Sequence, residues 1–182
     1  MLKTLFVSIA LIATAPMAVA GKNNIESAEA LVSSAAEDIA QSEREQVADA
    51  VLSHVDTKAI AKFTLGRHGR SLEADEKARF VAAFEDFMHR QIQANADQFS
   101  GVEVDLVDTT ARNARDAIVT TQVRNESNSL KMRWRVIERG GKWSVVDLEV
   151  AGIWLAIEQR AQVAAILSRP GSDIDDLIAQ FG

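Results

Sequence analysis

Residues 130–150 read LKMRWRVIERGGKWSVVDLEV, and this stretch decides the fold class. Apolar and polar side chains alternate on both sides of the Gly140-Gly141 pair, which is typical of two antiparallel strands joined by a tight turn. The length of the turn sets which residues lie opposite each other. A two-residue turn would place Trp134 opposite Asp147 and mix apolar with charged side chains on one face. A three-residue loop would place Trp134 opposite Val146, so we expect this loop and one wholly apolar face.

Two further strands are expected on the N-terminal side of this hairpin. The alternation continues through residues 117–123 and residues 102–106. A turn around residues 125–128 would place Val119 opposite Trp134 and extend the apolar face. The expected sheet is therefore an antiparallel meander with one apolar and one polar face.

Helical periodicity runs through residues 24–99 and resumes after Gly152. The individual helices that we expect cover residues 43–54, 57–65, 74–98, 153–167 and 173–181. Ser42, Asp56 and Ser172 are expected to cap the first, second and last of these, because their side-chain oxygens can accept hydrogen bonds from the first turn. Since helices and antiparallel strands are segregated along the chain, the sequence predicts one α+β domain.

The composition excludes several classes of protein. With 182 residues, 47% apolar and 25% charged, the chain is long enough for one globular domain and unlike a disordered or fibrous protein. The net charge of −6 argues against a nucleic-acid partner, whose binding surface is usually basic. The absence of cysteine excludes thiolate zinc sites, and His54, His68 and His89 show no metal-ligand spacing. No nucleophile, phosphate-loop or dinucleotide motif is present, so we expect no metal, no cofactor and no enzyme.

The first twenty residues have the pattern of a secretory signal peptide. They read MLKTLFVSIALIATAPMAVA, with Lys3 ahead of an apolar run over residues 5–15. Ala18 and Ala20 provide the small residues that precede a cleavage site, so we expect cleavage after Ala20 and a periplasmic domain of residues 21–182. An N-terminal membrane anchor is the alternative. No cysteine follows the apolar run, so we expect no lipid anchor.

An apolar face and a basic cluster are the candidate binding features. Periodicity alone does not distinguish a filled apolar core from a ligand pocket. The sheet residues concerned are Met132, Trp134, Val136, Val146 and Leu148, and the helix residues are Phe63, Leu65, Phe80, Phe84 and Phe87. The densest basic cluster consists of Arg67, His68 and Arg70, which we treat as candidates for contact with an anionic head group. The alternative for this cluster is a helix C-terminus whose cations face the helix dipole.

Three segments and the residues after them carry a family resemblance. Residues 55–67 read VDTKAIAKFTLGR, residues 80–87 read FVAAFEDF, and residues 143–153 read WSVVDLEVAGI, followed by Arg160 and by DDLI at residues 175–178. In this order they resemble the MlaC family of periplasmic phospholipid-binding proteins, also called the toluene-tolerance auxiliary component of an ABC transport system.

The resemblance implies an NTF2-like α+β fold, in which helices wrap a curved antiparallel sheet of about four strands and acyl chains lie between sheet and helices. It implies a periplasmic carrier, expected to be a monomer, that moves phospholipid between an outer-membrane lipoprotein–porin complex and an inner-membrane ABC transporter. The apolar sheet and helix residues named above would line the lipid pocket, together with Trp154 and Val163. Two sixteen-carbon chains hold about thirty methylenes at ~0.8 kcal/mol each, so roughly 20 kcal/mol opposes their exposure to water.

The chain departs from the family pattern at His68, Gly69, Trp154, Glu158, Gln159 and Val163. We expect these departures to reshape the pocket, so the cargo is either a phospholipid or another diacyl or polycyclic lipid, the latter as in hopanoid-associated relatives. Two other functions stay open: an NTF2-like enzyme, and an adaptor of the transporter that binds no lipid. The expected apolar face offers Thr121 but no acid or histidine, which favours a carrier without covalent catalysis.

Overall fold

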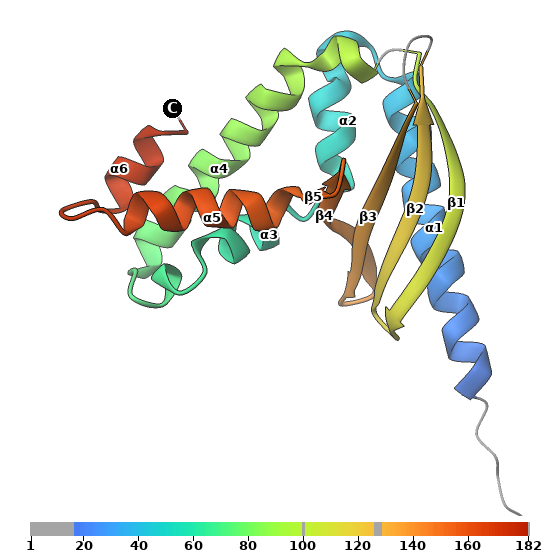
Figure 1. Cartoon of the computed structure of the whole chain (residues 1–182), viewed down its shortest axis with the longest axis horizontal. Coiled ribbons are helices and arrows are strands. Elements are labelled where there is room, and N and C mark those ends of the chain that lie inside the picture. Colours follow the sequence, from blue (N-terminus) through green and yellow to red (C-terminus); the bar gives the residue numbers. More distant parts are fainter. Residues whose placement is uncertain (1–16, 100, 126–128, 182) are drawn as a thin grey trace, which may run out of the picture.

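The computed structural model describes residues 17–99, 101–125 and 129–181, and the side chains of its first helix from residue 24 onward (Figure 1). The elements in chain order are α1 (Met17–Gln41), the 3-10 turn η1 (Arg44–Gln46), α2 (Val47–Ser53), α3 (Thr57–Leu65), the 3-10 turn η2 (His68–Arg70), α4 (Ala74–Ala94), the 3-10 turn η3 (Ala96–Phe99), β1 (Glu103–Asn113), β2 (Asp116–Arg124), β3 (Ser129–Arg139), β4 (Lys142–Val150), β5 (Ile153–Trp154), α5 (Leu155–Leu167) and α6 (Ile174–Ala179). Residues 1–16 of the expected signal peptide lie outside the described residues, and cleavage after Ala20 stays a prediction.

The five strands form one open antiparallel sheet in the order β1-β2-β3-β4-β5. Four of the strands are long and β5 has only two residues, so the expected α+β fold with about four strands is confirmed. The expected pairing of β2 with β3 is also confirmed: Val123 lies opposite Leu130, Thr121 opposite Met132 and Val119 opposite Trp134.

The turn between β3 and β4 differs from the prediction. Arg139 lies opposite Lys142, so Gly140 and Gly141 alone form the turn. Both glycines have positive φ, 60° and 84°. Two-residue turns of this kind match the twist of a hairpin, and glycine adopts them without a steric penalty. The expected three-residue loop is therefore wrong.

A β-bulge in β4 restores the apolar face that the longer loop was expected to provide. The register shifts by one residue beyond Arg135, and Val146 of β4 is the extra residue. Trp134 consequently lies opposite Leu148 and not opposite Val146. An extra residue in a strand changes the pairing as an extra residue in a loop does, so alternation alone does not separate the two solutions.

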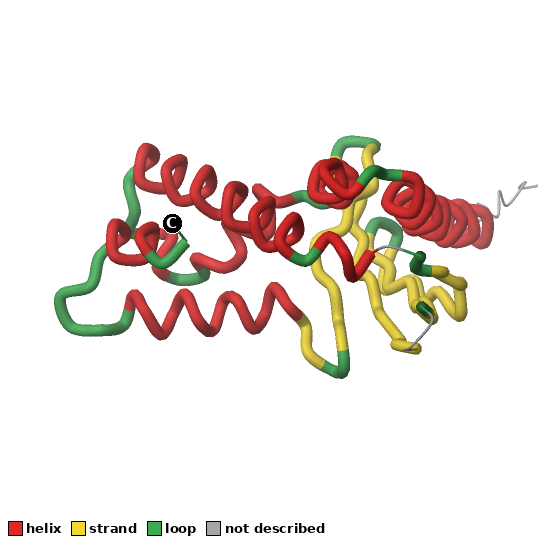
Figure 2. Tube along the Cα trace, turned by 90° about the horizontal axis from the view of Figure 1, so that it is seen from above, coloured by secondary structure: helices red, strands yellow, loops and turns green. Residues whose placement is uncertain are grey.

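One face of the sheet packs against α1, which runs along the strands (Figures 1 and 2). We call the buried cluster between them the sheet core; it consists of Ala28, Val32, Ala117, Val119, Trp134, Val136 and Val145. Residues of one strand alternate between the two faces, so the neighbours of these residues point the other way.

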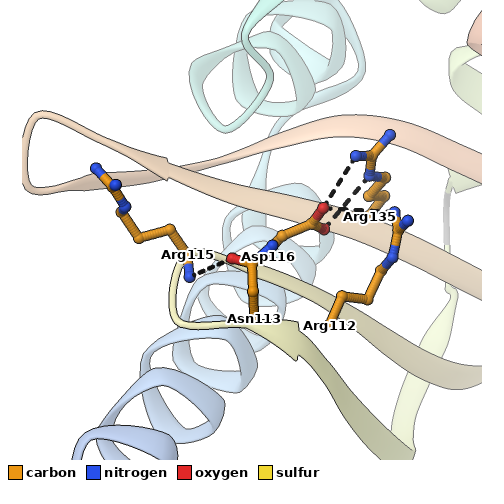
Figure 3. Close-up of polar contacts among 5 residues, drawn as sticks. All are labelled: Arg112, Asn113, Arg115, Asp116 and Arg135. Atoms are coloured by element: carbon orange, nitrogen blue, oxygen red, sulfur yellow. Dashed lines mark hydrogen bonds and ion pairs between the residues drawn. The ribbon is translucent and has the colours of Figure 1, made fainter.

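The opposite face of the sheet is polar. Asp116 is buried there, and its carboxylate lies 2.9 Å from Arg135 Nη2 and 3.4 Å from Arg112 Nη1 (Figure 3). Arg133 Nη1 donates to Glu149 at 2.7 Å across neighbouring strands. These cross-strand pairs satisfy the charges on this face, which leaves the α1 side as the apolar surface of the sheet.

Helices α3, α4, α5 and α6 enclose a second apolar cluster to one side of the sheet (Figure 1). We call it the helical core; it consists of Ile60, Ala61, Leu65, Phe80, Phe84, Ala156, Val163, Ile174, Leu177 and Phe181. The ring of Phe181 lies 5.7 Å from the rings of both Phe80 and Phe84, close to edge-on. Val55 packs against both the helical core and the sheet core, so it lies where the two meet.

The start and end of α3 are as expected. Asp56 Oδ1 accepts a hydrogen bond from the backbone amide of Ala59 at 3.0 Å, and the helix ends before Gly66, which has a positive φ of 53°. The helix expected over residues 74–98 is shorter: α4 ends at Ala94 and the 3-10 turn η3 follows.

Two expected helix caps are wrong. The Ser42 hydroxyl donates to the carbonyl of Ile39 at 2.8 Å, because α1 extends to Gln41 and Ser42 belongs to its C-terminal end. Helix α6 is capped by Asp173 and not by Ser172; the Asp173 carboxylate accepts from the amides of the first turn. A carboxylate at this position also matches the positive end of the helix dipole.

Candidate functional site

The residues predicted to line one pocket fall into two groups. Trp134 and Val136 lie in the sheet core, with Met132 and Leu148 packed beside them. Leu65, Phe80, Phe84 and Val163 are buried in the helical core, with Phe87 packed against it. The structure therefore does not bring the two groups together around one cavity, and their role in lipid binding stays a prediction.

The remaining predicted lining residues lie at the margins of these cores. Phe63 is 39% exposed, and its ring lies 4.9 Å from the guanidinium of Arg160. Trp154 is half-buried on the polar side of the sheet, where the guanidinium of Arg133 lies 5.4 Å from its ring. Val146 is the bulge residue of β4.

A cavity of about 160 Å³ lies between α1 and the first two strands. Its lining consists of Val32, Ser33, Ala36 and Glu37 from α1, Val104 and Leu106 from β1, and Thr121 from β2. Sequence reasoning found the alternation of Val104 and Leu106 but did not connect it with the apolar stripe of α1. That stripe, with Ala28, Val32 and Ala35 buried at spacings of three and four, was the available signal.

Polar groups at the floor of this cavity are paired with each other. Thr121 is buried, and its hydroxyl accepts a hydrogen bond from Trp134 Nε1 at 2.9 Å. Trp134 thus keeps an apolar ring in the sheet core while its N–H is satisfied. The lining offers one carboxylate, Glu37, which is exposed at the rim. This arrangement can hold an apolar chain but does not provide an acid–base pair.

The apolar face of the sheet continues beyond α1. Leu106 is 45% exposed and Leu130 is 37% exposed, although both lie on the same face as Thr121 and Trp134. Large apolar residues left exposed next to a cavity are typical of a binding surface.

The basic cluster predicted to contact a head group lies elsewhere. Arg67, His68 and Arg70 follow α3, at the end of the helical core, and none of them lines the cavity under α1. The guanidinium of Arg160 lies close to Gly66, the residue that precedes this cluster. A Cβ atom placed on Gly66 would be 2.9 Å from Arg160 Nε. The positive φ at position 66 favours glycine, and a Cβ atom there would also displace the flexible side chain of Arg160.

Asp147 is a buried carboxylate that sequence reasoning did not single out. Its Oδ1 accepts hydrogen bonds from the amides of Leu148 and Ala156, both at 2.8 Å. Burial raises the pKa of Asp147 above its ordinary value, although the two amides and the charge of Arg135 act in the opposite direction. Because Ala156 belongs to the first turn of α5, Asp147 holds the start of that helix against the sheet.

The described residues contain no candidate metal site and no candidate membrane span. Within the described residues, no group of His, Asp and Glu side chains has an arrangement that would hold a metal ion. In the same part of the chain, no helix combines the length and the apolar character needed to cross a membrane.

Comparison with known proteins gives a family and a fold. Residues 24–182 match the family model described as MlaC protein. A solved structure described as the phospholipid-binding protein from Ralstonia solanacearum in complex with a phospholipid has the same fold, with a TM-score of 0.72. It is 17% identical in sequence, and the match covers 87% of this chain and 94% of that one. No curated protein matches the chain.

Proposed function

This chain belongs to the MlaC family, and from that premise we propose that it is a lipid carrier whose acyl-chain site lies between α1 and the apolar face of the sheet. The family is periplasmic, and the solved protein of the same fold is described as bound to a phospholipid. A phospholipid is therefore the expected cargo.

One observation carries this proposal: the sheet core is apolar and incompletely filled. The partly exposed Leu106 lines the cavity under α1, and the apolar face extends further to Leu130. Water in contact with these side chains costs free energy, and an acyl chain lying along them would remove both surfaces from water. In the helical core, by contrast, the buried phenylalanines contact each other directly.

The cavity must enlarge to accept a whole acyl chain. Its volume of about 160 Å³ is smaller than the ~300–1,000 Å³ of usual ligand sites. The side chains that α1 buries include the small Ala28, which belongs to the sheet core, and Ala35, so α1 loses little buried area when it shifts. We propose that lipid uptake separates α1 from β1 and β2 and that Met132 and Trp134 then become walls of the site.

The cellular role that we propose follows from the family. A signal peptide over residues 1–20 would direct the chain to the periplasm, and the carrier would move lipid between an outer-membrane complex and an inner-membrane ABC transporter. Enclosure of the acyl chains is what such a route across water requires, since their exposure costs roughly 20 kcal/mol for two chains. Catalysis is not part of this proposal, because the described lining of the cavity lacks a paired acid and base.

Tryptophan fluorescence tests the position of the acyl chains. A Trp143→Phe/Trp154→Phe variant leaves Trp134 as the single fluorophore, since the chain has three tryptophans. We expect phospholipids brominated on the acyl chains to quench Trp134, because the bromines would lie against its ring.

Native mass spectrometry of the purified protein tests whether it carries a lipid at all. We expect a bound diacyl lipid, whereas an empty protein that still binds the transporter would favour the adaptor.

A matched pair of variants makes this test specific. Ala36→Phe fills the cavity from α1, and Ala40→Phe places the same side chain on an exposed position of the same helix. We expect the first variant to lose quenching by the brominated lipid and the second to keep it. Equal quenching in both variants would contradict a site between α1 and the sheet.

A further inference from the structure

A second, larger cavity lies beside Val55, where the two cores meet. Its volume is about 330 Å³, within the range of small-ligand sites. It is bounded by the N-terminus of α3, by α4 and by the β3–β4 hairpin, and its polar lining includes Thr57, Lys58, Glu85, Arg139, Lys142 and Ser144. None of these residues lines the cavity under α1.

Three cations line this cavity, and two of them are available to a ligand. Arg139 Nη1 is paired with Asp56 Oδ2 at 2.7 Å. Lys58 and Lys142 are exposed, and neither has an ion-pair partner among the residues that the structure describes. Two unpaired ammonium groups on the walls of one cavity are unusual on a chain whose net charge is −6. They attract an anion to this place.

The cavity also contains a carboxylate that no cation neutralises. Glu85 is half-buried, and its Oε1 accepts a hydrogen bond from the Thr57 hydroxyl at 2.8 Å. In the described part of the chain, no basic side chain lies within ion-pair distance of Glu85. The α3 and β4 walls thus each carry a free ammonium group and the α4 wall carries a free carboxylate, which is the pattern that a small zwitterion requires.

The walls of this cavity are held in place by contacts between the two cores. The amide of Asp56 donates to the carbonyl of Val145 at 2.9 Å, and the amide of Val145 donates to the carbonyl of His54 at 2.8 Å. Together with the Arg139–Asp56 pair, these bonds tie α3 to the β3–β4 hairpin. The cavity is thus built before a ligand arrives, which lowers the entropic cost of binding.

We propose that this cavity binds a small zwitterion that carries a phosphate and an ammonium group. The charge of a phosphate monoester, about −1.5 to −2 at neutral pH, matches the two free ammonium groups of Lys58 and Lys142. The Ser144 hydroxyl, which like Lys142 belongs to β4, also lines the cavity and adds a hydrogen-bond donor. Glu85 receives the ammonium group of the ligand. A soluble phosphate ester of an amino alcohol carries this monoester, and the head group of an amino phospholipid pairs the same ammonium group with a phosphodiester of lower negative charge.

Calorimetry on the full domain tests the proposal with O-phosphoethanolamine, inorganic phosphate and ethanolamine. We expect phosphoethanolamine to bind more tightly than phosphate, and ethanolamine not to bind measurably. Lys58→Gln/Lys142→Gln should weaken phosphoethanolamine about tenfold or more, because two charge-assisted contacts are lost. Glu85→Gln should abolish the preference over phosphate while leaving phosphate binding in place. Thermal unfolding of each variant shows that it is folded.

The matched control is Lys62→Gln/Lys131→Gln, which removes two exposed lysines that lie outside the cavity. An equal loss in the control pair would mean that only the overall charge matters and would overturn the proposal. Absence of phosphoethanolamine binding, or binding that ignores Lys58 and Lys142, would overturn it as well.

The source of the ligand is found with dihexanoyl phosphatidylethanolamine. Lipid binding that weakens in the Lys58→Gln/Lys142→Gln variant identifies a lipid head group, and binding of the soluble ester alone identifies a soluble ligand; both support the proposed chemistry. Ala36→Phe separates this site from the acyl-chain site, because it should leave phosphoethanolamine binding unchanged while it abolishes quenching of Trp134.

Discussion

The helical core and the sheet core of this protein are filled by side chains to different degrees. In the helical core, Phe80, Phe84 and Phe181 are at most 5% exposed and contact one another directly. In the sheet core, α1 contributes small side chains such as Ala28, and a cavity remains beside Thr121. The difference indicates that the helical core holds the fold together, whereas the sheet core keeps space that a lipid can use.

The largest expected effect comes from emptying the helical core. Phe84→Ala should lower the free energy of unfolding by about 3–5 kcal/mol, because it removes a large side chain that is 1% exposed. Phe63→Ala, at a position that is 39% exposed, should cost less than about 1 kcal/mol. Urea denaturation measures both values. Similar losses in the two variants would remove the distinction between a filled core and its margin.

Asp147 joins the two regions, and its variants separate hydrogen bonding from charge. Asp147→Ala should cost about 1–3 kcal/mol, because the amides of Leu148 and Ala156 lose their acceptor. Asp147→Asn keeps an acceptor oxygen without the buried charge, so it should be at least as stable as the wild type near neutral pH. A loss of stability in Asp147→Asn as large as that in Asp147→Ala would contradict the assignment of Asp147 as a hydrogen-bond acceptor whose charge is not needed.

The raised pKa of Asp147 predicts how the stability of the protein changes with pH. Because burial raises the pKa of Asp147 in the folded protein, the folded state binds this proton more tightly than the unfolded chain does. Its contribution is therefore fully present below the ordinary pKa of 3.8 and is lost as pH rises toward the raised value. The difference in unfolding free energy between the wild type and Asp147→Asn, measured across this window, should shift in favour of the variant as pH rises.

A matched pair of enlargements contrasts the two cores directly. Val32→Leu adds a methylene next to the cavity and should stabilise the protein by up to about 1 kcal/mol while weakening lipid binding. Val163→Leu makes the same change in the helical core, where it should destabilise by about 1–3 kcal/mol. Thermal unfolding and lipid titration check the pair. Destabilisation of equal size at both positions would show that the sheet core is as full as the helical core.

The smallest effect is expected on the polar side of the sheet. Trp154→Ser removes the contact between the Trp154 ring and Arg133, which should cost about 1 kcal/mol or less. Because this ring lies away from the cavity under α1, the set of lipids that co-purify should not change. A changed lipid profile would place Trp154 in the binding site after all.

The sequence determines local pairing better than it determines which cores form. The β2–β3 register follows from the alternation in residues 117–123 and 130–136, and the three residue pairs predicted from it are confirmed. The β3–β4 turn was predicted wrongly because the bulge at Val146 and a longer loop each shift the register by one residue, in opposite directions, and so put the same side chains on the apolar face.

The lining of the site was harder to predict than the strands, for a physical reason. Periodicity shows that Phe80 and Phe84 face an interior, but their partner Phe181 lies about a hundred residues away in the chain. The spacing along α4 contains no information about that partner. The cavity under α1 depends in the same way on residues of α1, β1 and β2 that meet only in the folded protein.

The central claim is that acyl chains lie between α1 and the sheet, and photo-crosslinking tests it most directly. A phospholipid with a diazirine near the end of one acyl chain is bound, irradiated and mapped by peptide mass spectrometry. We predict labelling of peptides that contain Val32 and Ala36 from α1 or Val104 and Leu106 from β1. Labelling concentrated on the peptides of α4 and α6 that form the helical core would contradict the account.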